Sequence, residues 1–128
     1  MPIFINTDAT RNAGLPFSQA VKSGNTLYLS GAIGNLPGKM ELVPGGIEAE
    51  SRQMMENIRE VLREAGSDFT HVVKAVVYLS DMADWPAFNK VYVPYFAAGK
   101  FPARTAIGAH QLILNARVEM ECWAETAS

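Results

Sequence analysis

Two charged residues in expected strands, Arg104 and Glu119, have a type and position that could do chemistry. Arg104 opens a strand after Pro102, and a guanidinium there presents a planar, two-pronged donor that can bind a carboxylate. Glu119 lies mid-strand between two apolar residues, where a carboxylate can orient or activate a water molecule. Both also have commoner roles, because most exposed charges are only solvated or weakly paired and glutamate is rarely buried without a partner.

Other residues offer little catalytic chemistry by pattern alone. His71 and His110 are isolated, Ser30 lacks the GxSxG context, and the sequence has no GxGxxG, HExxH or CxxC motif. Asn89 lies beside an aromatic stripe and could donate or accept a substrate hydrogen bond, although a solvent-facing asparagine is commoner. Cys122 has the pattern of a small buried hydrophobe. We therefore expect no metal ion and no organic cofactor.

Length and composition predict one ordinary globular domain spanning residues 1–128. The chain has 48% apolar and 19% charged residues, a formal net charge of -2 and a pI of about 5.6. The eleven basic residues are scattered, so we expect no nucleic-acid partner. A single cysteine, no signal-peptide pattern and no long apolar run lead us to expect a cytoplasmic protein that does not bind membranes.

The hydrophobic pattern predicts an α+β fold with one mixed sheet and two helices. The turn Ser23-Gly24-Asn25 separates two apolar runs and indicates a hairpin. Apolar residues at three- and four-residue spacing predict a helix over 47–65 that Gly66 terminates. The expected order is β-β-β-α-β-α-β-β, with strands at 2–6, 18–22, 26–33, 71–79, 104–110 and 117–125.

A second helix is expected after Asp81 or Asp84, either of which is a candidate N-cap. Pro86 suits its first turn, whereas Pro94 should kink or shorten it. With both helices on one face, the other face of the sheet stays open. Segment 71–79 is nevertheless apolar at nearly every position, as in a strand covered on both faces. An open apolar face predicts self-association.

Several segments, in this order and spacing, resemble the Rid (YjgF-type) family, whose members are also called endoribonuclease L-PSP. The resemblance covers about 16–124, almost the whole chain. Its landmarks are PFSQAV (16–21), LYLSGAIG (27–34), VPGGIEAESRQMMENI (43–58), AGSDFTHVVKAVVYLSDMADWPAFNKVYVPYF (65–96) and FPART (101–105).

The resemblance implies a chorismate-mutase-like fold in which three subunits join through their sheets, with ligand clefts between neighbouring subunits. It implies hydrolysis of reactive enamines and imines such as 2-aminoacrylate to 2-oxo acids and ammonia, without a cofactor. Arg104 falls on the family's carboxylate-binding arginine and Glu119 on its water-positioning glutamate. Further cleft positions of the family fall on Phe17, Ser30, Gly31, Asn89 and Ala106.

Three departures from the family pattern bear on the substrate. Phe17 replaces a tyrosine, which removes a hydroxyl and keeps the ring. Ala106 replaces a cysteine found in some members, where only the backbone is thought to matter. The usual Leu-Pro-Lys-Gly-type turn is replaced by residues 111–116, QLILNA, in a loop that borders the cleft. These departures leave the substrate preference open.

Three alternatives to a small-enamine deaminase follow. The first is a deaminase for a larger enamine, such as an aminomuconate-type intermediate. The second is a trimer that binds small carboxylates through Arg104 without catalysis. The third is RNA cleavage, suggested by the family label and opposed by the acidic pI and the lack of a basic stripe.

Overall fold

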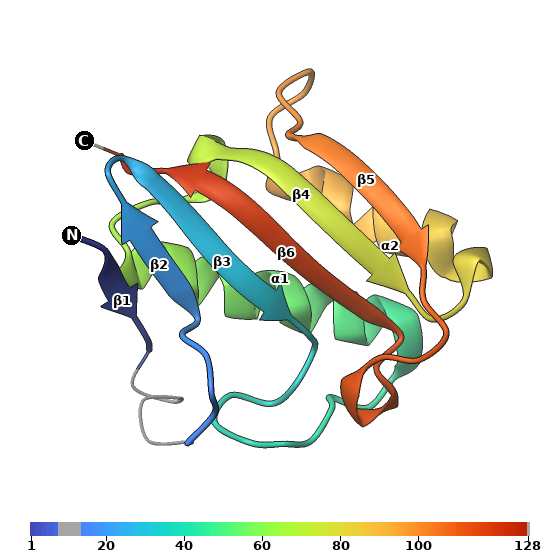
Figure 1. Cartoon of the computed structure of the whole chain (residues 1–128). Coiled ribbons are helices and arrows are strands. Elements are labelled where there is room, and N and C mark those ends of the chain that lie inside the picture. Colours follow the sequence, from blue (N-terminus) through green and yellow to red (C-terminus); the bar gives the residue numbers. More distant parts are fainter. Residues whose placement is uncertain (8–13, 128) are drawn as a thin grey trace.

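The computed structural model describes residues 1–7 and 14–127, which form one twisted sheet backed by two α-helices (Figure 1). The elements occur in the predicted order β-β-β-α-β-α-β-β. They are β1 (Ile3–Ile5), β2 (Ala20–Ser23), β3 (Thr26–Ala32), α1 (Gly46–Glu64), β4 (Val72–Leu79), α2 (Trp85–Tyr92), β5 (Ala103–Gly108) and β6 (Val118–Glu125). The α+β fold class is therefore confirmed.

The sheet order β1-β2-β3-β6-β4-β5 sets which side chains can share a site. All neighbouring strands are antiparallel except β4 and β5, which are parallel and are connected through α2. A parallel pair needs such a crossover connection, whereas β2 and β3 need only a tight turn at Gly24-Asn25. The last strand, β6, consequently lies in the middle of the sheet and β5 at its edge.

Helix α1 ends as its sequence predicts. The N–H of Gly66 donates to the carbonyl of Arg63 at 3.0 Å, and the N–H of Ser67 donates to the carbonyl of Leu62 at 2.8 Å. This Schellman pair requires a left-handed residue, and Gly66 supplies it with φ 76°. The helix lays Met54, Met55, Ile58, Val61 and Leu62 against the sheet.

Helix α2 is shorter than its aromatic pattern suggests. It ends at Tyr92, and Val93–Tyr95 continue as a 3-10 turn that contains Pro94, so the predicted shortening is confirmed. Asp81 caps a separate 3-10 turn over Met82–Asp84, where its carboxylate accepts a hydrogen bond from the N–H of Ala83. Asp84 stands at the N-cap position of α2 without a side-chain cap bond, because its carboxylate pairs with Arg117 at 3.1 Å.

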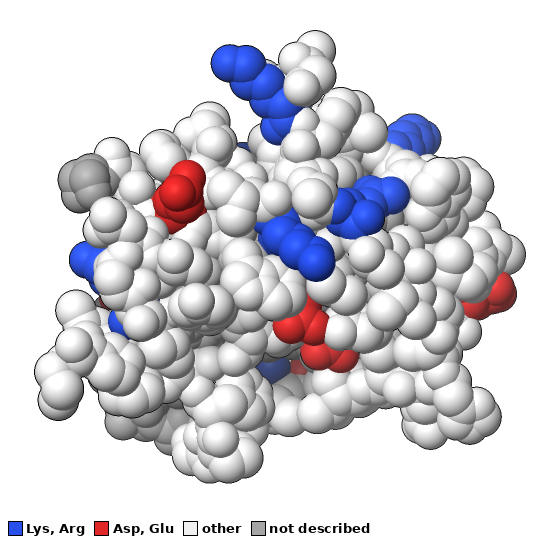
Figure 2. Space-filling model, turned by 45° about the horizontal axis from the view of Figure 1, so that its top comes forward, with Lys and Arg blue, Asp and Glu red and all other residues white. Residues whose placement is uncertain are grey.

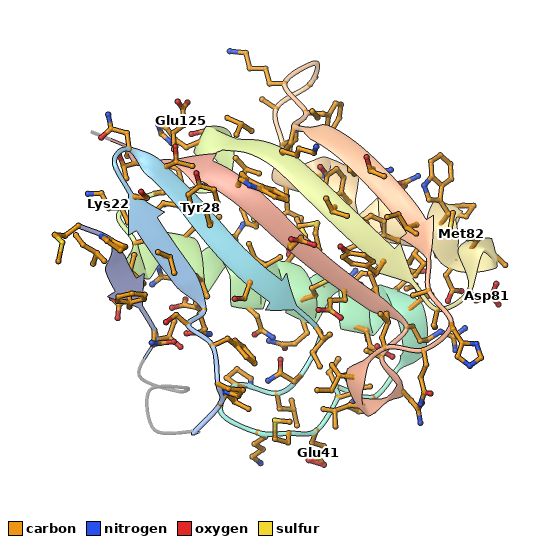
Figure 3. All side chains as sticks on the ribbon, in the orientation of Figure 1. Lys22, Tyr28, Glu41, Asp81, Met82 and Glu125 are labelled. Atoms are coloured by element: carbon orange, nitrogen blue, oxygen red, sulfur yellow. The ribbon has the colours of Figure 1, made fainter. Side chains whose placement is uncertain are left out.

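The helices bury one face of the sheet and leave the other open. Alternation along β6 is clean: Val118, Met120, Cys122 and Ala124 are buried beneath the helices. On the open face Tyr28 is 47% exposed, as the side-chain view illustrates (Figure 3). Val73 and Ile107 are similarly exposed on this face. Basic and acidic side chains are scattered among the uncharged ones on this side of the molecule (Figure 2). Within one chain, β4 is therefore covered on only one side, not on both as its composition suggests.

Candidate active site

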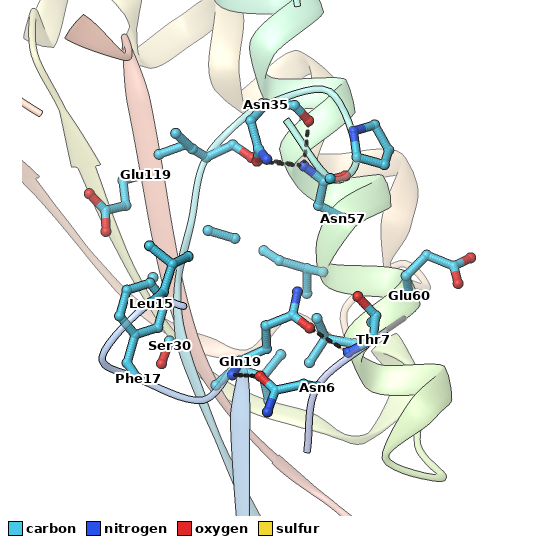
Figure 4. Close-up of a pocket in the computed structure, with 18 of the residues that line it drawn as sticks. Asn6, Thr7, Leu15, Phe17, Gln19, Ser30, Asn35, Asn57, Glu60 and Glu119 are labelled. Carbon is cyan, nitrogen blue, oxygen red and sulfur yellow. Dashed lines mark hydrogen bonds between the residues drawn. The ribbon is translucent and has the colours of Figure 1, made fainter. Parts of the chain in front are cut away.

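A groove of about 1000 Å³ runs between α1 and the loops that flank β2 and β3 (Figure 4). Four of the expected site residues, Phe17, Ser30, Gly31 and Glu119, line it. Phe17 is exposed to the groove, so its ring is available to a ligand. The Ser30 hydroxyl donates to the carbonyl of Ser18 at 2.6 Å and thereby fixes the loop that carries Phe17. These four residues form the first cluster of the site.

Gly31 and Glu119 are in unusually close contact. A Cβ atom on residue 31 would lie 2.1 Å from Glu119 Oε2, so only glycine lets the carboxylate occupy this place. The strand β3 carries an irregularity between Leu29 and Ala32, the segment that includes Gly31. Such irregularities re-aim side chains beside functional sites. The backbone of β3 is thus shaped around the glutamate of β6.

Glu119 lies half-buried on the open face of the sheet, paired in register with Tyr78. Burial, and to a lesser extent the charge of Glu121, raises the pKa of the Glu119 carboxyl above its ordinary value. Glu121 accepts a hydrogen bond from the Tyr78 hydroxyl, and this bond raises the Tyr78 pKa. A carboxylate with a raised pKa is a stronger base for holding and deprotonating water. Glu119 is therefore more than part of a solvated strand face.

The far end of the groove is lined by polar side chains that hydrogen-bond to other groups of the chain. The Asn57 side chain donates to the carbonyls of Ile33 and Asn35 at 3.0 Å and accepts from Gln53 at 2.9 Å. The Gln19 side chain accepts from the N–H of Thr7 at 2.6 Å. The Asn57 bonds tie the loop after β3 to α1, and the Gln19 bond ties the segment before β2 to the residue at the end of the described segment after β1. Sequence analysis missed this group, whose only signal is an asparagine placed between apolar helix positions.

Arg104 lies on a different part of the molecule, against α2. Its guanidinium carbon is 4.7 Å from the ring centroid of Tyr92, 5.5 Å from that of Phe88 and 5.9 Å from that of Trp85. Three aromatic rings stabilise the cation. Arg104 forms no ion pair with any carboxylate of the described ranges 1–7 and 14–127. Among the described residues, Arg104 thus makes none of the weak surface ion pairs that are the commoner role of an exposed charge.

Asn89 and Ala106 lie on the same side of the sheet as Arg104. Arg104 pairs in register with buried Ala75, and Ala106 pairs with buried Val77, so both face the helices. The Oδ1 atom of Asn89 is buried and has no hydrogen-bond partner among the described residues. Buried polar atoms normally have partners, so this oxygen is a candidate ligand contact. The solvent-facing position that we considered for Asn89 is wrong.

The buried Tyr92 hydroxyl completes this second cluster, which consists of Asn89, Tyr92, Arg104 and Ala106. It also lacks a hydrogen-bond partner within the described part of the chain. Burial raises the Tyr92 pKa, and the nearby Arg104 charge opposes the rise. Phe88 and Tyr92 belong to the hydrophobic core, and their rings are also where the Arg104 guanidinium packs.

One chain does not bring the two clusters together. Glu119 shares its row of the sheet with Tyr78 and Ile107 on the open face, whereas Arg104 shares a row with Ala75 on the helix-covered face. The central strand β4 separates their strands. A substrate that contacts both residues therefore cannot be bound by this chain alone in the observed conformation.

In residues 1–7 and 14–127, no group of three or more His, Cys, Asp or Glu side chains is arranged to hold a metal ion. No helix formed by the described residues is both long and apolar enough to cross a bilayer. Cys122 is buried, and burial raises its pKa to about 12, so the thiol is not activated as a nucleophile.

The six-stranded sheet backed by two helices places the chain in the Rid/YjgF fold class. A Rid-family protein from Yersinia pestis superimposes with a TM-score of 0.92 at 32% identity, over 98% of this chain and 100% of that one. RidA from an Antarctic Psychrobacter species superimposes with a TM-score of 0.88 at 37% identity, over 96% and 98% of the two chains. The family model for endoribonuclease L-PSP matches residues 8–126, and the chain belongs to this family.

Two similar proteins carry an activity in their names. A 2-iminobutanoate/2-iminopropanoate deaminase from Capra hircus is 48% identical over 109 residues, which cover 85% of this chain and 79% of that protein. The protein of the same name from Homo sapiens is 42% identical over 120 residues, covering 94% and 87% of the two chains.

Proposed function

We propose that this protein is a deaminase that hydrolyses reactive 2-imino acids and their enamine tautomers to 2-oxo acids and ammonia. The observation that carries the proposal is the Arg104 guanidinium, which is held by aromatic rings and left without a carboxylate partner among the described residues. Such a donor suits a small carboxylate. The similarity to deaminases of 2-iminobutanoate and 2-iminopropanoate supports the same substrate group.

We further propose that the working form is a homotrimer whose sites lie between subunits. The split between the two clusters supports this, because a second copy can supply the missing half of each site. The open sheet face, with exposed Tyr28, Val73 and Ile107, supplies an apolar contact surface. We also assign the protein to the cytoplasm, where a free thiol such as Cys122 is commonplace.

In this proposal each cluster has its own task. Arg104 of one subunit binds the substrate carboxylate through two charge-assisted hydrogen bonds and thereby orients the imine carbon. Glu119 of a neighbouring subunit holds a water molecule and takes a proton from it as its oxygen attacks that carbon. The C=N bond becomes a C–N single bond, and Glu119 passes the proton it took from water to the nitrogen, which gives the carbinolamine. Glu119 then takes the proton of the carbinolamine hydroxyl and passes it to the amine as the C–N bond breaks, so that ammonia leaves and the C=O bond of the 2-oxo acid forms.

Replacing Glu119 by glutamine tests the proposed reaction. With 2-aminoacrylate generated in situ from serine by a dehydratase, wild type should accelerate ammonia release, and Glu119→Gln should lower kcat by about 10²–10⁴-fold, the usual contribution of a general base. Because burial raises the Glu119 pKa, the wild-type rate should fall as pH drops through that raised value. The variant should lack this acidic limb. No acceleration by wild type would exclude the small-enamine assignment.

The same substitution should raise stability at neutral pH. Since the folded-state pKa of Glu119 lies above the unfolded value, its contribution favours folding at low pH and is lost as pH rises through the folded pKa. Glutamine carries no charge and removes this penalty. Thermal melts at pH 7 should therefore place Glu119→Gln above wild type, and the difference should shrink as the carboxyl of wild type is protonated in acid.

Gly31 and Gly34 offer a matched pair of alanine substitutions. A Cβ at 31 meets only the flexible end of Glu119, so Gly31→Ala should displace the carboxylate, keep the fold and cost about 10–100-fold in kcat/KM. A Cβ at 34 meets the backbone carbonyl oxygen of Glu50 at 2.4 Å, so Gly34→Ala should destabilise the fold by about 1–3 kcal/mol. Melting curves and rates measured together separate the two effects. Full activity in Gly31→Ala would remove Glu119 from the mechanism.

A binding role without catalysis is the second candidate function. The second cluster favours it, because the Arg104 guanidinium can bind a carboxylate equally well with or without turnover. The unpartnered Asn89 oxygen can accept a hydrogen bond from a donor group of the same ligand. It predicts that 2-oxo acids bind to Glu119→Gln as to wild type while neither protein releases ammonia.

A further inference from the structure

The loop between β5 and β6 places two apolar side chains beside the first cluster, in a backbone conformation that leucine rarely adopts. Leu114 has φ 58° and ψ 19°, and Asn115 follows with φ 57°. In this left-handed region Cβ crowds the following carbonyl, which asparagine tolerates far better than leucine. An outlier of this kind persists only when the surrounding structure enforces it, and such outliers gather at functional sites.

The base of this loop is firmly anchored. The N–H of Arg117 donates at 2.9 Å to the carboxylate of Glu50, a side chain almost fully buried at the foot of α1. Ala116 is completely buried, and the Gln111 side chain donates to that of Asn115 at 2.9 Å. The tip is therefore held in one place by its base, not by burial of its own side chains.

The tip side chains line the same groove as Glu119 and Gly31. Ile113 is 58% exposed and Leu114 is 37% exposed, so both present apolar surface to the groove. Three further exposed apolar side chains line it, and they are Leu15, Phe17 and Met40. The Glu119 carboxylate thus shares the groove with a group of exposed apolar side chains, while the far end of the groove is polar.

The groove is far larger than the smallest substrate of the proposed reaction. In the single chain its volume of about 1000 Å³ lies at the upper end of the range for drug-sized ligands, about 300–1000 Å³, and in the proposed trimer a neighbouring subunit would occupy part of it. 2-Iminopropanoate has a single methyl group as its side chain and would leave most of the apolar lining in contact with water. A longer apolar side chain would displace that water and gain affinity, by about fourfold for each buried methylene.

We propose that Leu114, together with Ile113, is a specificity-determining element that selects 2-imino acids with an apolar side chain of three or more carbons. This inference rests on the proposed deaminase function and adds the class of side chain to it. The strained backbone directs the Leu114 side chain toward the groove. The anchored base keeps the tip of the loop from moving away from the groove into solvent.

A series of imines that differ only in side chain tests this. An amino-acid oxidase generates them in situ from alanine, 2-aminobutanoate, norvaline and leucine, and trapping by semicarbazide competes with their hydrolysis. The quantity compared is kcat/KM for the leucine-derived imine divided by that for the alanine-derived imine. We expect a ratio above about ten for wild type, from three added carbons, and a ratio about five- to tenfold lower for Leu114→Gly.

Asn115→Gly is the matched control. It relieves the same left-handed conformation and loses the hydrogen bond from Gln111 but no apolar side chain, so its ratio should fall far less than that of Leu114→Gly. A wild-type ratio of one or less, or equal losses in Leu114→Gly and Asn115→Gly, would overturn the specificity role and leave the deaminase intact. Absence of turnover with every imine would instead overturn the deaminase proposal, and this inference with it.

Discussion

Replacing Arg104 by alanine should lower kcat/KM for any 2-imino acid by about two to three orders of magnitude, mainly through KM. Truncating one partner of a desolvated charge pair costs about 2–5 kcal/mol, and each 1.36 kcal/mol is a factor of ten. The guanidinium has no carboxylate partner of its own among the described residues, so the substrate carboxylate is its expected counterion. Steady-state kinetics with 2-aminoacrylate and the leucine-derived imine measure the effect.

Arg59 provides a control with the same kind of packing. Its guanidinium carbon stands 5.1 Å from the ring centroid of Tyr95 and 5.8 Å from that of Phe69, and it is also paired with Glu56 at 3.0 Å. Arg59→Ala should therefore lose similar aromatic contacts and keep wild-type kinetics. Arg104→Lys should recover only part of the activity, since an ammonium keeps the charge and loses the two-pronged geometry. Wild-type KM in Arg104→Ala would remove Arg104 from the substrate site.

Much of the fold could be predicted because its signals are local. The clean alternation along 117–125 fixes which side chains of β6 lie under the helices, and the structure buries those residues. The spacing over 47–65 and the glycine that follows specify α1 and its end. Periodicity alone does not predict where helix α2 ends. Pro94 has no N–H to continue the helical hydrogen bonds, and the residues around it form a 3-10 turn instead.

The site was only partly predictable because it depends on contacts between distant segments. The resemblance to the family assigned seven residues to the clefts between subunits: Phe17, Ser30, Gly31, Asn89, Arg104, Ala106 and Glu119. Within one chain only Phe17, Ser30, Gly31 and Glu119 line one groove. Sequence spacing carries no signal that Arg104 faces the opposite side of the sheet, since that follows from the register between β4 and β5. The left-handed backbone at Leu114 could not be predicted from the sequence either. A glycine at this position would have indicated a positive φ, whereas leucine rarely adopts one.

Both clusters contain features that suit the proposed function and lower the stability of the isolated chain. Glu119 is partly buried with its pKa raised, and two buried oxygens near Arg104, those of Asn89 and Tyr92, lack partners in the described part of the chain. Leu114 adds backbone strain of about 1–2 kcal/mol. Each feature costs folding free energy in the isolated chain. In the proposed trimer, a bound substrate and a neighbouring subunit would offset these unfavourable contributions to folding. The unfavourable features therefore lie where the two clusters would meet.

Mixing two inactive variants should restore activity if each site is shared between subunits. In the proposed trimer, an active cleft needs Glu119 from one subunit and Arg104 from the next. Neither Arg104→Ala nor Glu119→Gln has such a cleft alone. When equal amounts are denatured and refolded together, half the subunits keep each residue, so about one quarter of the clefts should be complete in a symmetric ring. Ammonia release should then rise to about one quarter of the wild-type rate.

The double variant Arg104→Ala/Glu119→Gln is the control for this mixture. Combined with either single variant, it cannot form a complete cleft, so refolding alone should restore nothing. Suppose that the mixture of single variants releases ammonia no faster than the two variants measured separately, while gel filtration shows mixed oligomers. The two residues then do not share a cleft across subunits. Either residue would then act within its own chain, and since β4 lies between their strands, a change of the sheet itself would be needed to bring them together.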